Sequence, residues 1–541
     1  MYLEFSMLLP FFVIIPVLIA VFLFVFSSVK AARKIAIVFQ AAYAVFAFYL
    51  LVVAREGEIM ANVGDYSGFM GIILRADTLA AAFILLASVI FFVSAVYALH
   101  DNNSRLFWFL LFLLEGALVG LFLTRDFFNV FVLVEVSTIV TTILLMYDRK
   151  RRNMFAGMTF IMVNIIVMQF YLFGLGYLYL FTGMLDFEPV AYAISHMDEA
   201  QLILPYALIM TSVAAKCSLM PMMIWLPKVN AMSGARSSIS AIISGLHIKS
   251  GVYLFIRVQE VFGDFAIANR DFFMIIAVIT AFGAIILALS QNDMRKMLAY
   301  STVAQVSLIL IGFNMGTETS NLGSLYHVIN HAFFKAALFL AAGMIIGRYK
   351  TKDITKIRGL WKSSTPLAFG TVISVLGMVG APLFNGSISK YLLMYDMNGP
   401  LEWIVILINV GTILVFVRFS TIFFGTNTRK LREFGLDMCK HGAVIGLGIA
   451  CLLFGIFGVQ IIHFLFVETV RIDPFGYLQK VGIFAASVGA AILLYRYVLA
   501  GLLAKETSII GRLNGFDMGF KSLCISIGVF FLVILGYVGF I

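Results

Sequence analysis

Charged residues are scarce in this sequence. Only 12% of the 541 residues are charged and 62% are hydrophobic, and the mean hydropathy is +1.02. In a soluble domain, roughly a quarter of the residues are charged. This composition excludes a soluble enzyme, and the high apolar content excludes an intrinsically disordered chain.

Cysteines are also few, and nucleotide-binding motifs are absent. The four cysteines show no C-x-x-C spacing, so the sequence has no signature of an iron–sulfur cluster, a zinc site or an attached haem. It contains no P-loop and no dinucleotide-binding fingerprint. We therefore expect no cofactor and no redox chemistry on this chain, and the sequence leaves open whether the chain is part of an enzyme.

Long apolar runs fill most of the chain. A hydrocarbon core about 30 Å thick needs about 20 apolar residues per helix, and the sequence contains about sixteen such runs. This pattern predicts an all-α polytopic membrane protein with about 16 transmembrane helices. The approximate centres are Ile15, Tyr43, Leu86, Leu114, Thr138, Met168, Ile209, Gly245, Val278, Leu308, Leu338, Val375, Leu414, Leu453, Ala491 and Phe530.

The net charge of +10 suits either a nucleic-acid partner or the loop asymmetry of a membrane protein. One set of alternate loops holds 25 of the 38 basic residues and the other set holds seven. Cytoplasmic loops carry such an excess of Lys and Arg. We therefore expect a location in the cell membrane, both termini on the non-cytoplasmic side, contact with the lipid bilayer and no nucleic-acid partner.

Ionisable side chains inside the apolar runs are the informative residues. Each costs at least about 2.5–3.5 kcal/mol at the bilayer centre, so its presence needs a reason. The candidates are Glu135, Lys216, Lys249, His327, His331, Lys335 and Lys390, with Glu115 and His247 as additional groups. His327, His331 and Lys335 recur at intervals of four residues and share one helix face.

Two interpretations of these charges remain open. They can form structural ion pairs, or they can exchange protons. Two carboxylates, Glu135 and Glu115, cannot neutralise four lysines by simple pairing, and an ammonium group removed from water gives up its proton more readily. This favours a proton relay. A metal or haem held by His327 and His331 is disfavoured, because no further ligand accompanies them in that run.

Prolines interrupt two of the apolar runs. Pro221 and Pro227 follow Lys216, and Pro382 precedes Lys390. Interrupted helices at corresponding places in two halves of a transporter indicate inverted repeats with an ion path at the midplane. The alternative is an ordinary proline kink in a packed bundle, which the sequence pattern leaves open.

Several blocks of the sequence resemble a known family. They include FLTRDFFNVFVLVEVSTIV, KCSLMPMMIWLPKVNAMSGARSSISAIISGLHIKSGVYLFIRV, LYHVINHAFFKAALFLAAGMI and APLFNGSISKYLL. They are similar to the antiporter-like, proton-conducting membrane subunits of respiratory complex I, of Mrp-type cation/proton antiporters and of membrane-bound energy-converting hydrogenases. The resemblance covers residues from about 68 to about 425, and the first block is most similar to the Mrp D-type subunit.

The resemblance implies roles for the matching residues. Glu135 and Lys216 correspond to the family's coupled pair on the fifth helix and the broken seventh helix. Lys249 corresponds to the central lysine of the eighth helix, and Lys390 to the exit-side group of the broken twelfth helix. The histidines His327 and His331, with Lys335, correspond to the eleventh-helix block. Glu115 has no counterpart in the family's motifs.

The resemblance also implies a domain organisation. A 14-helix core with two inverted five-helix repeats, and helices 7 and 12 broken, would be followed by a C-terminal hairpin. We expect helices 1–3 in residues 1–105, the first repeat in 106–258, the second repeat in 271–425 and helices 14–16 in 440–541. About seventeen residues separate the last two spans, too few for a long lateral helix at 1.5 Å per residue.

Three functions remain in competition. The chain is a proton-translocating subunit of a redox-driven complex, a D-type subunit of an Mrp-like Na+/H+ antiporter, or a scaffold that has lost conduction. The relay residues argue against the scaffold. The expected partners are other antiporter-like and small membrane subunits, with a peripheral redox module in the first case. The transported ion is H+, and the sequence leaves Na+ open.

Overall fold

The computed structural model describes residues 6–63, 71–232, 236–426, 436–504 and 508–540. Among these residues, fourteen helices are long and apolar enough to cross a membrane. A helix satisfies its own backbone hydrogen bonds, and for this reason apolar runs of about 20 residues adopt it in lipid. The prediction of an all-α polytopic membrane protein is confirmed. Three of the basic loops that predict the orientation in the membrane lie partly outside the described residues, at 233–235, 427–435 and 505–507.

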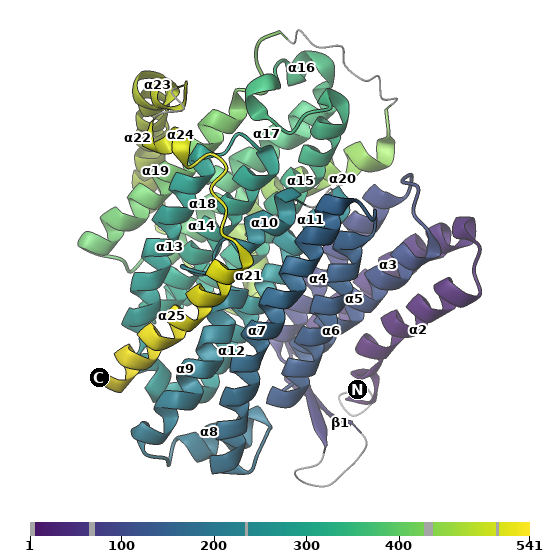
Figure 1. Cartoon of the computed structure of the whole chain (residues 1–541), viewed down its shortest axis with the longest axis vertical. Coiled ribbons are helices and arrows are strands. Elements are labelled where there is room, and N and C mark those ends of the chain that lie inside the picture. The colour runs from purple at the N-terminus through teal and green to yellow at the C-terminus, as the bar shows by residue number, and fades with distance from the viewer. Residues whose placement is uncertain (1–5, 64–70, 233–235, 427–435, 505–507, 541) are drawn as a thin grey trace.

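The first part of the chain forms one edge of the helix bundle (Figure 1). Helix α2 packs against α5, and α3 packs against α4. Aspartates cap two of these helices, because the side chains of Asp77 and Asp126 accept hydrogen bonds from the first backbone N–H groups of α4 and α6. The bounds are α2 Phe11–Val25, α3 Val29–Ala54, α4 Thr78–Ala98, α5 Arg105–Leu123 and α6 Phe127–Met146.

The middle of the chain fills the centre of the bundle. The helix α15 packs against α14, α17, α18 and α20, and α11 also contacts it. The bounds are α7 Arg151–Thr182, α8 Phe187–Ile194, α9 Glu199–Lys216, α10 Trp225–Met232, α11 Ser237–Ile242, the π-helix η1 Ile243–His247, α12 Ile248–Ala268, α13 Arg270–Ser290, α14 Met294–Met315 and α15 Glu318–Tyr349.

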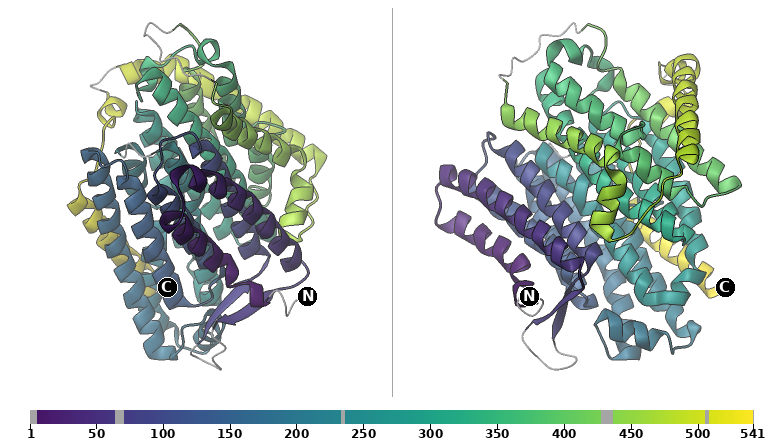
Figure 2. Two further views of the ribbon diagram at one scale, coloured as in Figure 1. Left: turned by 90° about the vertical axis from the view of Figure 1, so that its right-hand side faces the viewer. Right: turned by 180° about the vertical axis from the view of Figure 1, so that it is seen from behind.

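The last part of the chain forms the opposite edge, seen from behind in Figure 2. There α22 packs against α19, whereas α25 returns across the bundle to α7 and α9. The bounds are η2 Ile354–Lys356, α16 Leu360–Ser363, α17 Thr365–Val379, α18 Asn385–Leu393, α19 Pro400–Ser420, α20 Met438–Ile456, α21 Gly458–Phe466, α22 Pro474–Leu494, η3 Tyr495–Leu499, α23 Ala500–Ala504, α24 Ile509–Arg512 and α25 Phe520–Phe540.

The number of candidate spans differs from the expected sixteen. Fourteen of the predicted centres lie in the fourteen long helices, and the other two, Ile209 and Val375, lie in shorter segments. Helix α9 has 18 residues and includes Pro205, and α17 has 15. Both end at an interruption, so neither reaches the length and apolar content of the other fourteen.

A small β-hairpin departs from the all-helical prediction. The strands β1 (Ile59–Val63) and β2 (Ile72–Ala76) pair in antiparallel register, with Ile59 opposite Ala76. The hairpin lies at the lower end of the bundle in Figure 1, beside the start of α2 and on the same side as α8. Outside the apolar helices, backbone groups need another partner, and pairing between two short strands supplies it.

Two backbone bridges with the same pattern tie distant loops together. Phe127 N donates to Leu185 O (2.9 Å) and Phe187 N donates to Arg125 O (2.7 Å). The second bridge joins Met294 N to Lys352 O (2.8 Å) and Ile354 N to Asn292 O (2.9 Å). Every atom of the second bridge lies 167 residues after its counterpart in the first. The first bridge is next to α8 and the second is near α16, at opposite ends of the bundle in Figure 1.

Candidate functional site

The first interruption places Lys216 at the end of α9. The segment 217–224 between α9 and α10 is not helical and contains Pro221, whereas Pro227 lies in the first turn of α10. Side chains satisfy backbone groups that the break exposes: Met220 N donates to Thr280 Oγ1 (2.9 Å), and Trp225 Nε1 donates to Ala215 O (2.9 Å). The break is therefore a stable feature that holds the lysine at the end of a helix.

Neutral groups hold the Lys216 ammonium. Its Nζ donates to Asn164 Oδ1 (2.6 Å) on α7 and to Thr138 Oγ1 (3.3 Å) on α6. Glu135 lies one turn before Thr138 and interacts electrostatically with Lys216, although no ion pair joins the two within the described residues. The Oε1 atom of Glu135 is buried without a hydrogen-bond partner in the part of the chain that the structure describes. The pair is thus close enough to attract and is not locked together.

A close helix contact connects Lys216 to α12. A Cβ on Gly251 would lie 2.8 Å from the Lys216 carbonyl carbon, so only glycine allows this approach. One turn before Gly251, His247 interacts electrostatically with Lys216. The His247 ring is buried edge-on against Phe160 with centroids 6.2 Å apart, and its Nδ1 has no partner among the described residues. His247 therefore continues the series of ionisable groups from α9 to the end of η1, directly before α12.

Lys249 is fully buried next to a π-helical turn. Its Nζ donates to the carbonyl oxygen of Ser244 in η1. The Ser244 hydroxyl accepts a hydrogen bond from Asn230 Nδ2 (3.2 Å) on α10. Because a π-helical turn loosens the regular hydrogen-bond ladder, it gives the lysine a carbonyl oxygen that an α-helix would use internally.

The helix α15 carries the next groups on one face. His327, His331 and Lys335 are all fully buried, and the two imidazole rings stack with centroids 6.3 Å apart. Neither ring nitrogen of His331 has a partner among the described residues. His331 interacts electrostatically with four groups: Lys249, Lys335, His327 and Lys390. It therefore lies between the lysine of α12 and the lysine of α18.

Lys335 occupies a side position on this face. Its Nζ donates to Leu298 O (3.0 Å) and Ser301 Oγ (2.5 Å) on α14, and it lies 5.9 Å from the ring centroid of Phe416. It also interacts electrostatically with Lys249. No carboxylate pairs with it within the described part of the chain, so its charge acts directly on the neighbouring lysine.

The second interruption holds Lys390. Helix α17 ends at Val379, and Pro382 lies in the break before α18. The Lys390 Nζ donates to two carbonyl oxygens in the last turn of α17, those of Met378 (3.2 Å) and Val379 (3.3 Å). These oxygens have no helical partner, and they lie at the negative end of the helix dipole, where a cation is favoured.

His327 joins α15 to this second interruption. Its Nδ1 lies 2.8 Å from Ser389 Oγ, and its Nε2 lies 3.0 Å from Gln305 Oε1. Ser389 precedes Lys390 directly. A cavity of about 70 Å³ then opens beside Lys390, with Lys480 and Ser487 of α22 in its wall. The series of polar groups therefore ends at a space between α18 and α22.

Glu115 lies apart from this series. It is fully buried on α5, and its Oε2 accepts a hydrogen bond from Gln40 Nε2 on α3. No lysine pairs with it within the described residues, and its Oε1 has no partner. Glu115 is therefore not a second counter-ion for the four buried lysines.

The arrangement brings most of the expected groups into one buried series through the centre of the bundle. In order they are Glu135, Lys216, His247, Lys249, His331, His327 and Lys390, with Lys335 beside Lys249. Several of their polar atoms have no protein partner, whereas buried polar groups normally bind protein or water. Such groups can exchange protons through bridging water.

Sequence reasoning missed the neutral members of the series. Asn164 holds Lys216, Ser244 holds Lys249, and Ser389 with Gln305 holds His327. Asn164 and Gln305 had a detectable signal, because each is an amide within a long apolar run. The serines had none, because small hydroxyl residues are common where membrane helices pack closely.

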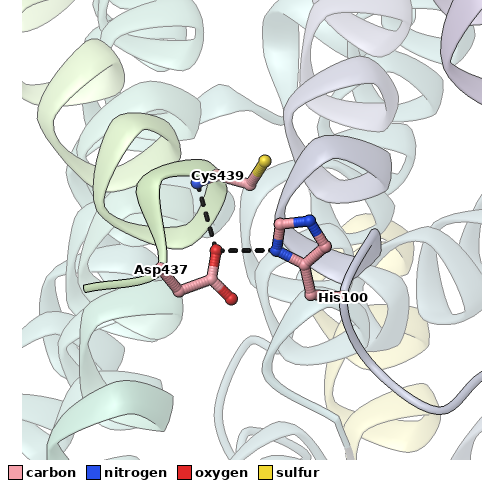
Figure 3. Close-up of side chains that lie close together, drawn as sticks. All are labelled: His100, Asp437 and Cys439. Carbon is pink, nitrogen blue, oxygen red and sulfur yellow. Dashed lines mark hydrogen bonds and ion pairs between the residues drawn. The ribbon is translucent and has the colours of Figure 1, made fainter. Parts of the chain in front are cut away.

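Three potential metal ligands meet elsewhere, at the start of α20. Ligand atoms of His100, Asp437 and Cys439 all lie within 4.8 Å of one another. Figure 3 shows the His100 ring facing the Asp437 carboxylate, with Nδ1 3.0 Å from Oδ1. The same Oδ1 accepts from Cys439 N (3.1 Å) and caps α20. A helix cap and an ion pair account for this group.

Comparison with known proteins places this arrangement in a wider context. A family model described as NADH:quinone oxidoreductase/Mrp antiporter, TM, matches residues 124–415. The D-type subunit of the Na(+)/H(+) antiporter of Alkalihalophilus pseudofirmus is 29% identical over 391 residues, covering 71% of this chain and 79% of that protein. The N-type subunit of the NADH-quinone oxidoreductase of Desulforudis audaxviator is 29% identical over 421 residues, covering 72% and 83%.

Solved structures share the fold. A chain of the Mrp complex from Dietzia sp. aligns with a TM-score of 0.80 at 20% identity, covering 88% of this chain and 99% of that one. A chain of the archaeal membrane-bound sulfane sulfur reductase gives 0.78 at 21%, covering 90% and 100%. A chain of respiratory complex I from Thermus thermophilus gives 0.74 at 22%, covering 89% and 100%.

Proposed function

Since the chain belongs to the family of NADH:quinone oxidoreductase and Mrp antiporter membrane subunits, whose model matches more than half of its residues, we propose that it translocates protons within a multisubunit membrane complex. The observation that carries the proposal is the buried series of lysines and histidines. His331 is its central element, because both ring nitrogens are unpartnered and four cationic or titratable groups surround it.

In this proposal the charges act on one another in sequence. Like charges on neighbouring groups repel one another, and this repulsion is screened less inside the protein than in water. A proton that arrives on one lysine therefore disfavours a proton on its neighbour. Glu135 favours the charged form of Lys216, and a change at that pair passes through Lys249 and His331 to Lys390.

The finer topology is part of the proposal. Residues 106–258 and 271–425 form two inverted five-helix repeats, with α9–α10 and α17–α18 as the broken helices of a 16-span chain. The support is the pair of backbone bridges that repeat after 167 residues at opposite ends of the bundle. Both termini lie on the non-cytoplasmic side, in agreement with the basic loops.

The setting of the complex has two candidates. We propose a redox-driven complex, in which a peripheral module alters the Glu135–Lys216 pair and this chain carries no cofactor. The 29% identity to an NADH-quinone oxidoreductase subunit over 421 residues supports it. The second candidate is an Mrp-like Na+/H+ antiporter, which the 29% identity to a Na(+)/H(+) antiporter subunit supports. In either setting, a Na+ path belongs in a partner subunit, because closely spaced lysines repel a cation.

Purification separates these settings. The tagged chain, extracted gently from its own cells, should bring down its membrane partners for identification by mass spectrometry. Redox subunits together with further antiporter-like subunits support the redox-driven complex. A set of small membrane subunits without any redox protein supports the antiporter.

Proton translocation itself is tested in sealed vesicles that contain the complex. Lys249→Ala and Lys390→Ala should each abolish H+ translocation, because each removes a group with no substitute in the series. Lys356→Ala, at an exposed cytoplasmic-loop lysine paired with Asp353, is the control and should retain activity. All three complexes should assemble with the same subunits. Normal translocation by both relay variants would exclude the proposed path.

A further inference from the structure

A second cavity lies away from the proton path, on the side of the bundle with the basic loops. Its volume is about 430 Å³. Residues near the ends of α4, α11, α14, α15, α17 and α20 contribute to its wall. None of the residues of the proposed relay lines it. The charged residues in its wall are Asp101, Arg236, Arg295, Arg348, Asp437 and Lys440.

The wall carries more positive than negative charge. Four cationic side chains face two carboxylates. Lys440 engages both carboxylates, with its Nζ 2.5 Å from Asp101 Oδ1 and 4.0 Å from Asp437 Oδ2. Arg236 pairs with Asp148, which is outside the cavity wall, at 3.5 Å. Both acids of the wall therefore already have partners, Lys440 for Asp101 and His100 with Lys440 for Asp437.

Two arginines of the wall have unused hydrogen-bond donors. Arg348 donates to the carbonyl oxygen of Ser363, and its Nε is buried without a partner among the described residues. The same holds for the Nη1 of Arg236 within that part of the chain. Both atoms are enclosed by protein, so they do not themselves face the cavity. The guanidinium group of Arg348 has no carboxylate partner within the described residues, and the wall keeps a surplus of cationic side chains. Such a wall suits an acceptor with several oxygens.

We propose that this cavity binds an organic anion through its phosphate group, with Arg348 and Arg236 as the anchoring residues. The planar guanidinium group matches the oxygens of a phosphate and forms paired, charge-assisted hydrogen bonds with it. The cavity also has apolar wall residues, Met344 and Leu367, that suit the carbon part of the ligand. Basic pockets between membrane helices on the cytoplasmic side commonly receive phospholipid headgroups, and a soluble phosphate ester offers the same chemistry.

Binding to the purified complex in detergent tests the proposal with two probes. One is dihexanoyl phosphatidylglycerol, a short-chain anionic lipid, and the other is glycerol 3-phosphate. Zwitterionic dihexanoyl phosphatidylcholine measures non-specific lipid binding. Tighter binding of the phosphatidylglycerol probe assigns the site to a lipid headgroup, whereas tighter binding of glycerol 3-phosphate assigns it to a soluble ester. If neither anion binds more tightly than the zwitterion, the proposal is overturned.

Variants locate the binding in the cavity. Arg348→Gln should weaken binding of the preferred anion at least tenfold, and Arg348→Lys, which keeps the charge, should weaken it less. Arg151→Gln is the matched control, because this arginine is exposed at the start of α7 on the same side. Equal affinities for Arg348→Gln and Arg151→Gln would place the anion elsewhere and overturn the proposal. The subunit composition of each complex shows that the variants are assembled.

Discussion

The buried lysines share one property at the level of single residues. Within the described chain, Lys216, Lys249, Lys335 and Lys390 each donate to carbonyl, amide or hydroxyl oxygens and not to a carboxylate. A carboxylate in direct contact would hold the ammonium in its charged form. Neutral acceptors stabilise the charge less, so the neighbouring charges decide the protonation state. This is the property that a proton relay requires.

Ser389 provides a test of the proposed link between the histidines and Lys390. Ser389→Ala removes the hydroxyl that contacts His327 Nδ1 at 2.8 Å and leaves a buried ring nitrogen unpartnered, at a cost of about 1–3 kcal/mol. If this link forms during proton transfer, the rate falls about tenfold for each 1.4 kcal/mol. We expect initial rates of H+ translocation in sealed vesicles to fall about tenfold, and Ser389→Thr to restore most of the rate.

The same helix supplies the control for this prediction. Ser387 lies two residues earlier, and its hydroxyl contacts Tyr477 Oη of α22 at 2.9 Å. Ser387→Ala removes a hydroxyl of the same kind from α18 but leaves His327 untouched. Equal rates for the Ser387→Ala and Ser389→Ala complexes would show that the histidine link has no part in translocation.

Sequence reasoning at the residue scale found the charges because they are costly in lipid. It could not find their partners, because Ser244 acts through its position in a π-helical turn and Ser389 through its position in the helix that follows a break. It also counted Glu115 as a counter-ion for the lysines, because this carboxylate lies within an apolar run. The structure places that carboxylate next to Gln40, on helices that hold no relay lysine.

At the level of elements, the two interruptions share two features. Each places a lysine near helix-end carbonyl groups or amide oxygens within the bundle, and each has a glycine that allows a close approach. Gly251 admits the backbone of Lys216, and a Cβ on Gly386 would lie 2.0 Å from the Gly377 carbonyl oxygen. The position of each lysine is therefore set by backbone packing and not by an ion pair.

Proline alone did not indicate which helices break. Pro16 and Pro205 lie inside the continuous helices α2 and α9, whereas Pro221 and Pro382 lie in interruptions. Neighbouring helices in a bundle can satisfy the carbonyl that a proline frees, so a proline is compatible with both outcomes. Four aspartates give a clearer sequence signal. The number of residues between Asp126 and Asp186 equals the number between Asp293 and Asp353.

The bridge at Asp126 and Asp186 predicts a pH dependence. Burial raises the pKa of Asp186 to about 6, and the charges of Asp126 and Glu188 contribute to the rise. Both aspartates lie outside the membrane-spanning helices. Because the pKa is higher in the folded than in the unfolded state, the folded state binds more protons between about pH 4 and pH 6. The protonated Asp186 side chain therefore stabilises the folded state fully below this range. This stabilisation is lost as the pH rises through 6.

Thermal unfolding of the purified complex measures this effect. The variant Asp186→Asn cannot ionise, so its midpoint should exceed that of the natural chain at pH 8. The difference should shrink toward pH 4.5, where Asp186 is protonated in the folded state. A difference that stays constant over this range would contradict the assigned ionisation of Asp186 in the folded state.

At the level of the whole molecule, the C-terminal helices cover both interruptions. The cavity beside Lys390 has residues of α22 in its wall. Helix α25 packs on α9 and α7, where Leu523 and Ile527 enclose a small space with Asn164, the acceptor of Lys216. The connection between the two helices is anchored to α10, because Lys228 Nζ donates to Met518 O (2.9 Å) and pairs with Asp517 (3.2 Å). We infer that the C-terminal pair shields the two ends of the proposed proton path from lipid.

Removal of one side chain from this seal tests that role. Ile527 is 1% exposed, and Ile527→Ala would open a cavity beside Asn164 whose cost is on the order of 2 kcal/mol. The new space adjoins polar groups, so it can admit water next to Lys216. We expect a lower midpoint of thermal unfolding and a faster passive proton leak in vesicles without an energy source. Val529→Ala, two residues later at a side chain that is 48% exposed, should change neither. Leak rates that are equal in both variants would mean that α25 packs against the first interruption without sealing it.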